Sequence, residues 1–220
     1  MSNLARCFTN PVDVEAQLTA IGPGLCIELL HNCLKAGHSA RENTSQFHPR
    51  LHGPFNGYAE GTAMLRMQLW AHGWTLDDGG NYARIVSPDG KHCIVVSSGD
   101  ENTGIDGGTD PLSRSPKGSM TEAAVNLNAQ LTFLGGLGMA PTPADRGDLG
   151  PRTWVLLVNE TEETIRAELS TPTHFEGGRP EMRATRLLLP PYDLGDGSDP
   201  RRRGPDSGDD FDVDIVRRQA

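Results

Sequence analysis

A glycine-rich stretch in the middle of the chain carries three closely spaced carboxylates, Asp100, Glu101 and Asp106. Clustered carboxylate oxygens are the ligands that hard divalent cations prefer. The stretch departs from an EF-hand, because Ile105 stands where that loop has its glycine and Pro111 where it has its bidentate glutamate. We therefore expect a solvated loop here, with a divalent-cation site of another kind, formed by these three carboxylates, as the alternative.

Two basic residues, Arg114 and Lys117, follow in the same stretch, just before a helix that we expect to begin at Ser119. The backbone N–H groups and the dipole at a helix N-terminus attract anions. The expected role of Ser119 is to cap its own helix, in a capping box with Glu122. Phosphate binding through Arg114 and Lys117 is the alternative, although the pattern is not GxxxxGK[ST].

Four zinc-ligand residue types, Cys26, His31, Cys33 and His38, lie close together in an expected helix. On a helix the two cysteines share one face and the two histidines share another, about 140° away. Four ligands on one helix cannot then converge on a tetrahedral ion. We expect no metal site from these four, while two of them could contribute to a site completed elsewhere.

No catalytic set is evident, because the sequence lacks GxSxG and its remaining cysteines have no local partners. The 29 acidic and 20 basic side chains give a net charge of −9. That charge disfavours nucleic-acid binding, which needs cations opposite the phosphates. Arg166, Arg183 and Arg186 could still form a basic stripe, although we expect them to pair with glutamates across strands.

The residue pattern predicts an α+β fold with N-terminal helices, a β-hairpin, a further helix and a three-strand antiparallel meander. The expected helices are 25–36 (ending at Gly37), 58–73 (with Trp70 beside its buried stripe) and one opening at Ser119; the expected strands are 82–86, 92–97, 153–158, 164–170 and 182–189. Residues 38–57 are expected to be irregular, because Pro49, Gly53 and Pro54 interrupt them.

Residues 1–191 are expected to form a single domain, because neither half carries enough apolar residues to fold comfortably alone. Residues 192–220, rich in Asp, Gly, Pro and Arg, are expected to be a disordered, mostly acidic tail. No run of 18 apolar residues indicates a membrane span. The first residues lack the apolar core of a secretory signal, so we expect a cytoplasmic protein with reduced thiols.

Three segments carry a resemblance to known sequences: Gly99–Gly104, Ser115–Asn128, and the meander from Thr153 to Ser170. Together, over roughly residues 55–190, they resemble small uncharacterised proteins of phages, plasmids and integrated elements in GC-rich bacteria. The resemblance implies a mobile-element context, and it assigns no activity and no residue roles.

These observations predict an accessory protein of a mobile genetic element that binds a host or element protein, such as one in a defence or nucleic-acid-handling complex. The alternative is a divalent-metal enzyme acting on a phosphate ester or nucleic acid. It would use Asp100, Glu101 and Asp106 for the metal and Lys117 for the phosphate. No cofactor other than a divalent cation is expected.

Overall fold

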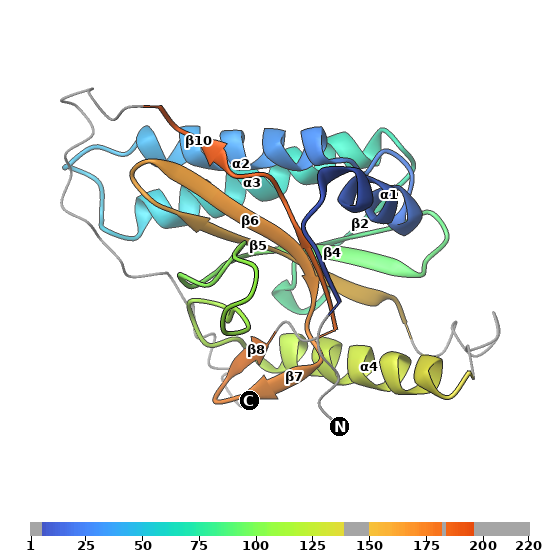
Figure 1. Cartoon of the computed structure of the whole chain (residues 1–220). Helices are drawn as coiled ribbons and strands as arrows, with labels where there is room; N and C mark the ends of the chain where they lie inside the picture. The colour runs from blue at the N-terminus through green and yellow to red at the C-terminus, as the bar shows by residue number, and fades with distance from the viewer. Residues whose placement is uncertain (1–5, 139–149, 182–183, 196–220) are drawn as a thin grey trace, which may run out of the picture.

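The computed structural model describes residues 6–138, 150–181 and 184–195. Within them, α-helices and two β-sheets form an α+β fold, as predicted (Figure 1). The helices are α1 (Pro11–Ile21), α2 (Ile27–Glu42), α3 (His52–Trp70) and α4 (Ser119–Gly136). The strands are β1 (Arg6–Phe8), β2 (Thr75–Asp77), β3 (Arg84–Val86), β4 (His92–Ser98), β5 (Arg152–Glu160), β6 (Thr164–Thr171), β7 (His174–Glu176), β8 (Arg179–Glu181), β9 (Thr185–Leu188) and β10 (Tyr192–Asp193).

The main sheet has eight strands in the order β1-β9-β6-β5-β4-β3-β2, with β10 paired to β6. The predicted β3–β4 hairpin and the antiparallel β5–β6–β9 meander are both present. The sequence pattern did not reveal that β4 and β5 pair in parallel, with α4 as the connection between them. Because they run in parallel, β4 and β5 present their carboxyl ends at the same edge of the sheet.

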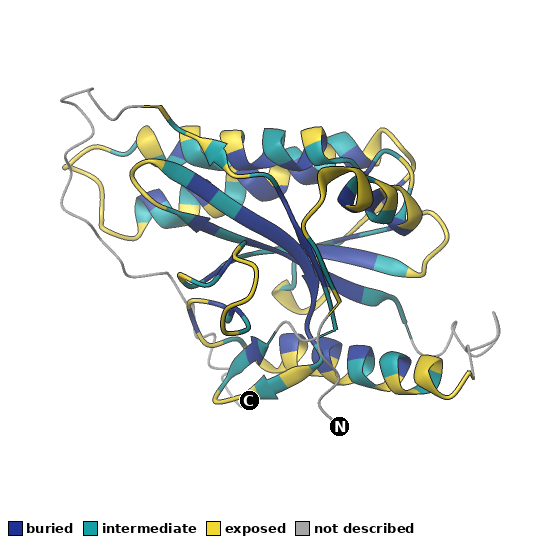
Figure 2. Ribbon diagram, in the orientation of Figure 1, coloured by how far each residue is buried: buried dark blue, intermediate teal, exposed yellow. Residues whose placement is uncertain are grey.

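Helices cover both faces of the sheet (Figure 1). α1, α2 and α3 lie on one face, and α4 lies on the other together with the small β7–β8 hairpin. Burial follows this arrangement. Consecutive residues of β5 and β6 are buried, so both faces of these strands are covered, and the ribbon of these strands is mostly dark blue while the helices carry yellow stretches (Figure 2). The sheet is therefore the middle layer of the molecule.

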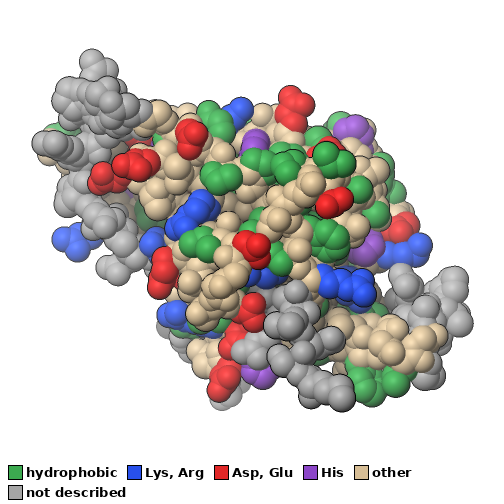
Figure 3. Space-filling view, in the orientation of Figure 1, with side chains coloured by type: hydrophobic (Ala, Val, Ile, Leu, Met, Phe, Trp, Pro, Cys, Tyr) green, Lys and Arg blue, Asp and Glu red, His purple; other side chains and the backbone are tan. Residues whose placement is uncertain are grey.

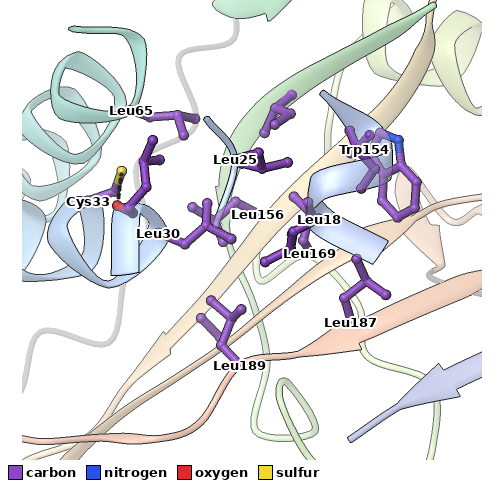
Figure 4. Packing of buried hydrophobic residues seen from close by; sticks show 14 of the residues in the cluster. Leu18, Leu25, Leu30, Cys33, Leu65, Trp154, Leu156, Leu169, Leu187 and Leu189 are labelled. Atoms are coloured by element: carbon purple, nitrogen blue, oxygen red, sulfur yellow. Dashed lines mark hydrogen bonds between the residues drawn. The ribbon is translucent and has the colours of Figure 1, made fainter. Parts of the chain in front are cut away.

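The largest hydrophobic cluster joins the N-terminal helices to the sheet. Leu18 of α1, Leu30 of α2 and Leu65 of α3 pack in the same cluster as Leu156 of β5 and Leu169 of β6 (Figure 4). Burying a leucine side chain contributes about 1.5–3 kcal/mol to folding. The helices and the late strands thus share one core.

α2 continues beyond the expected stop at Gly37 and ends at Glu42. Gly37 lies against α3, where a Cβ added to it would be 2.8 Å from the carbonyl oxygen of Gly57. The prediction of a helix end was wrong because this glycine permits close packing of two helices instead of ending one.

α3 begins at His52, inside the segment that was expected to be irregular. Pro54 is the third residue of this helix, where a backbone N–H has no partner within the helix and its loss costs little. Gly53 is buried in the first turn and Gly57 in the second, both against α2. The breaking residues therefore mark the start of α3, and Trp70, at its end, is exposed.

α4 begins at Ser119 as predicted, but the capping box is absent. Gly118 is the N-cap residue, and no side chain caps the helix. The backbone N–H groups of Thr121 and Glu122 donate to the carbonyl of Gly118 instead. The boundary was predictable, while the capping interaction was not.

The predicted half-exposed character of β6 is wrong. Ile165, Ala167 and Leu169 face the core as expected, but Glu168 and Ser170 on the other face are also fully buried. The loop between β4 and α4 covers them. The polar side of a strand with alternating apolar and polar residues can therefore be buried when a loop covers it.

The predicted tail begins with ordered structure, because Tyr192 and Asp193 form β10 and pair with β6. Residues 196–220 of that tail lie outside the described residues, as does Met182, the expected start of the last strand. Arg183 and the arginines at 201–203 lie outside them as well.

Candidate functional site

The three predicted metal-binding carboxylates do not converge. Asp100 organises its own loop, because its Oδ1 accepts from the N–H of Asn102 at 3.1 Å and its Oδ2 from the N–H of Leu112 at 3.1 Å. Glu101 and Asp106 are exposed, and no group of three possible ligands within the described residues includes any of the three. Hydrogen bonds from backbone N–H groups to Asp100 close the loop.

A buried ion pair fastens this loop to the sheet. Glu168 of β6 and Arg186 of β9 are 0% and 3% exposed, and the Arg186 guanidinium donates to both Glu168 oxygens, at 3.0 and 2.6 Å. The loop completes the network, since the N–H of Gly104 donates to Glu168 and the carbonyl of Ile105 accepts from Arg186. The expected cross-strand pairing of Arg186 is thus observed.

Arg114 and Lys117 lie in different surroundings. The Arg114 side chain lines a pocket beside α2 and α3. The backbone N–H of Lys117 donates to Gly178 in the β7–β8 turn at 2.7 Å, and its side chain does not line that pocket. The predicted anion site at the start of α4 therefore does not bring the two cations together.

The pocket lies between α2, α3 and the carboxyl ends of β4 and β5. In sheets with parallel strands, ligands bind outside the carboxyl ends of those strands. Aliphatic side chains form its floor, and its polar lining includes His38, Arg41, Arg114, Asn159 and Glu160. The cavity volume is about 70 Å³. That is room for about five water molecules or one small polar group.

A hydrogen-bonded histidine–glutamate pair forms part of this polar lining. The Nδ1 atom of His38 is 2.8 Å from Oε1 of Glu160, and both side chains are mostly buried. Arg41 Nε lies 3.7 Å from the other oxygen of Glu160. Glu42, one helical turn beyond His38, brings a second carboxylate to the group, and the ligand atoms of His38, Glu42 and Glu160 all lie within 4.8 Å of one another.

The end of β5 is itself held in place by a polar network. The side-chain amide of Asn159 donates to the carbonyl of Gly99 at 3.2 Å, and its oxygen accepts from Arg166 at 3.1 Å. Arg166 is therefore engaged beside the pocket and does not form a basic stripe with Arg186. The next residue, Glu160, is the last residue of β5 and lies opposite Ile165 of β6.

The cysteine–histidine cluster of α2 divides as its helical geometry predicts. Cys26 Sγ accepts from the N–H of Leu29 at the start of the helix, and Cys33 Sγ donates to the Leu29 carbonyl. Burial raises the pKa of the Cys33 thiol to about 12. His31 contacts the carbonyl of Pro190, and two of the four residues, Cys33 and His38, line the pocket.

Sequence reasoning missed Glu42 and Glu160 as partners of His38. The i, i+4 spacing of His38 and Glu42 on a helix was a usable signal, because such residues share a face. It was lost because the helix was expected to end at Gly37. Nothing in the sequence placed Glu160 beside them, because that contact depends on how the sheet packs against α2.

The outer face of α3 carries exposed apolar side chains among the polar residues Asn56, Glu60 and Arg66. Phe55, Ala63, Met67 and Trp70 lie on this face, and the three large side chains are 51%, 60% and 67% exposed. We call these four residues the α3 stripe. Contiguous exposed apolar residues on a protein surface are typical of interaction sites. Elsewhere, on the face shown in Figure 3, acidic and basic side chains are interspersed.

Comparison with other proteins gives no independent assignment of this site. No family model matches the chain, and no curated protein and no solved structure matches it. Among the described helices, none is both long enough and apolar enough to cross a membrane.

Proposed function

We propose that the chain is an accessory protein that binds a protein partner through the α3 stripe. The observation that carries the proposal is the exposure of Phe55, Met67 and Trp70 on one face of a helix whose opposite face is buried. Large aromatic and Met side chains are the types enriched at protein interfaces. As part of the same proposal, the chain is encoded by a phage, a plasmid or an integrated element. Its partner is then a host protein or another protein of that element.

The partner is expected to have an apolar groove surrounded by basic residues. The groove would bury the α3 stripe as an amphipathic helix is buried in helix-in-groove recognition. The net charge of −9 favours encounter with a basic surface. Such steering predicts association that slows as the salt concentration rises.

The test compares an α3-stripe variant with a matched variant on another helix. Met67→Glu with Trp70→Glu changes exposed residues of α3, and Phe133→Glu changes a residue of α4 that is 67% exposed. Native mass spectrometry of the protein isolated from its host identifies the partner, and calorimetry then gives the dissociation constant. We expect the α3-stripe variant to bind at least about tenfold more weakly, and Phe133→Glu to bind as the parent does.

Equal affinity of the α3-stripe variant and the parent would overturn the proposal. So would a concentration-dependent dimer of the parent that the α3-stripe variant abolishes, because the stripe would then bind a second copy of this chain.

A second candidate function is a divalent-metal enzyme acting on a phosphate ester or nucleic acid. The convergence of His38, Glu42 and Glu160 beside Arg114 favours it, while the ligands first expected, Asp100, Glu101 and Asp106, do not converge. Hydrolysis of a phosphodiester in the presence of Mn²⁺ that falls at least about 100-fold in Glu160→Gln, and not in the exposed Glu162→Gln, would support it. Activity retained in Glu160→Gln would exclude this site as its source.

A further inference from the structure

Three potential metal ligands from two distant parts of the chain meet at the edge of the pocket. His38 and Glu42 lie one turn apart near the end of α2, and Glu160 is the last residue of β5. Their ligand atoms lie within 4.8 Å of one another. We propose that these three side chains bind a divalent transition-metal ion.

The residue types fit such an ion. One imidazole nitrogen and two carboxylate oxygens suit Zn²⁺, Mn²⁺ or Fe²⁺ better than Ca²⁺ or Mg²⁺, which prefer oxygen ligands alone. Donor atoms on a tetrahedral ion at about 2.1 Å lie about 3.4 Å apart. Side-chain rotations that move the donor atoms by about 1 Å therefore bring all three to bonding distance from one ion. Three protein ligands leave a coordination position open, as in catalytic zinc sites.

The hydrogen bond between His38 and Glu160 already prepares the site. His38 Nδ1 and Glu160 Oε1 are 2.8 Å apart. The ion would bind both atoms in place of the hydrogen bond between them. Neutral imidazole binds a metal through one ring nitrogen while its proton stays on the other, so His38 would bind through Nδ1 with the proton on Nε2. Arg41, 3.7 Å from Glu160, would remain outside the ligand set and orient the carboxylate.

Arg114 defines what can occupy the open position. It lines the same pocket as His38 and Glu160, so the pocket that adjoins the proposed ion also contains a guanidinium. Arginine binds the oxygens of phosphate in a forked geometry. The cavity of about 70 Å³ admits a group of that size. The fourth ligand is therefore a phosphate group, with inorganic phosphate as its simplest form.

The first measurement is a titration of the protein with Co²⁺, which reports coordination through its visible absorption. We expect one equivalent to bind with the absorption of a four- or five-coordinate nitrogen–oxygen site. His38→Gln, Glu42→Gln and Glu160→Gln are each expected to weaken binding at least about 100-fold, more than the usual effect of losing a supporting residue. Glu42 is exposed, so Glu42→Gln keeps the His38–Glu160 pair and should leave the fold intact.

Two control variants address other surface ligands. His174 lies with Glu176 and Glu181 on the β7–β8 hairpin, and His48 stacks on His52 with ring centroids 4.2 Å apart. His174→Ala and His48→Ala should bind Co²⁺ as the parent does. Binding lost in either control but kept in Glu42→Gln would overturn the proposal, and so would thiolate-to-cobalt charge transfer, which would reveal cysteine ligands. No binding at about 1 mM Co²⁺ would overturn it as well.

Inorganic phosphate then tests the open position. Its addition to the Co²⁺-loaded protein should change the visible spectrum, and Arg114→Gln should weaken this effect at least about tenfold without changing Co²⁺ affinity. An unchanged spectrum, or an equal response in Arg114→Gln, would contradict the assignment of phosphate. These readouts need no turnover and no protein partner, so the site is tested independently of the α3 stripe. The second candidate function uses the same three ligands: loss of the site would reject both, whereas Co²⁺ and phosphate binding without phosphodiester hydrolysis would reject the enzyme alone.

Discussion

At the scale of single residues, the most consequential interaction is the ion pair between Glu168 and Arg186. Both side chains are buried, and both also bond to the backbone of the loop between β4 and α4. Removing charges from water is costly, so such a pair is stable only while each partner has the other. The pair therefore holds the loop on the sheet and, through it, the segment that carries Arg114.

Replacement of one partner should be strongly destabilising. Glu168→Gln keeps the shape of the side chain but leaves Arg186 buried without its counter-charge. We expect the free energy of unfolding to fall by about 3–5 kcal/mol, measured by urea denaturation. The exposed Glu162→Gln should change it by less than about 0.5 kcal/mol. Equal stabilities of the two variants would show that the Glu168 carboxylate does not stabilise the fold.

At the scale of elements, α2 and α3 depend on glycines at their contact. Gly37 and Gly57 allow the two backbones to approach, since a Cβ on Gly37 would lie 2.8 Å from the Gly57 carbonyl oxygen. α2 in turn carries His38 and Glu42, so the same contact sets the position of two proposed metal ligands relative to the pocket.

Gly37→Ala should therefore destabilise the protein although alanine is the better helix former. Overpacking is expected to lower the free energy of unfolding by about 1–3 kcal/mol, against a gain in helix propensity of at most about 1 kcal/mol. Gly135→Ala is the matched control, because Gly135 is also helical and a Cβ there meets nothing within 4 Å. It should be neutral or stabilising in the same urea denaturation measurement. A stable Gly37→Ala protein would show that the helices can separate at little cost.

α4 is fastened to the sheet by one buried amide. Asn128 donates to the carbonyls of Thr153 and Pro172 at 2.8 and 3.0 Å, and it accepts from the N–H of Thr153 at 2.9 Å. Asn128→Ala leaves these backbone groups unpaired, so we expect a loss of about 2–4 kcal/mol and faster hydrogen exchange in α4. Asn126→Ala, at an exposed position of the same helix, should change neither. Unchanged exchange in Asn128→Ala would mean that α4 is held by its apolar contacts alone.

At the scale of the whole molecule, one core connects segments that are far apart in the sequence. Leucines of α1, α2 and α3 pack with leucines of β5, β6 and β9 in one cluster (Figure 4). We therefore expect the protein to unfold in one cooperative transition. Tryptophan fluorescence, which reports on buried Trp74 and Trp154, and far-UV circular dichroism should give the same urea midpoint. Separate midpoints would contradict the expectation that residues 1–191 form a single domain.

The sequence alone determined the type and approximate place of most long elements. The periodicity of residues 58–69, the Pro-Asp-Gly turn at 88–90 and the alternation in 164–170 are local signals, and the structure has a helix, a hairpin and a strand there. Helical geometry alone likewise predicted that Cys26 and Cys33 lie on a different face of the helix from His31 and His38. Such conclusions need only the 3.6- and 2-residue periods of the backbone.

The tertiary structure decided everything that depends on contacts between distant segments. Gly37 continues a helix because Gly57 lies opposite, Glu168 is buried because the loop covers it, and Glu160 meets His38 because β5 ends beside α2. In each case the residue type permits two environments, and only packing selects one. A carboxylate in the sequence has no fixed partner, so only the packing of the sheet against α2 could bring Glu160 to His38.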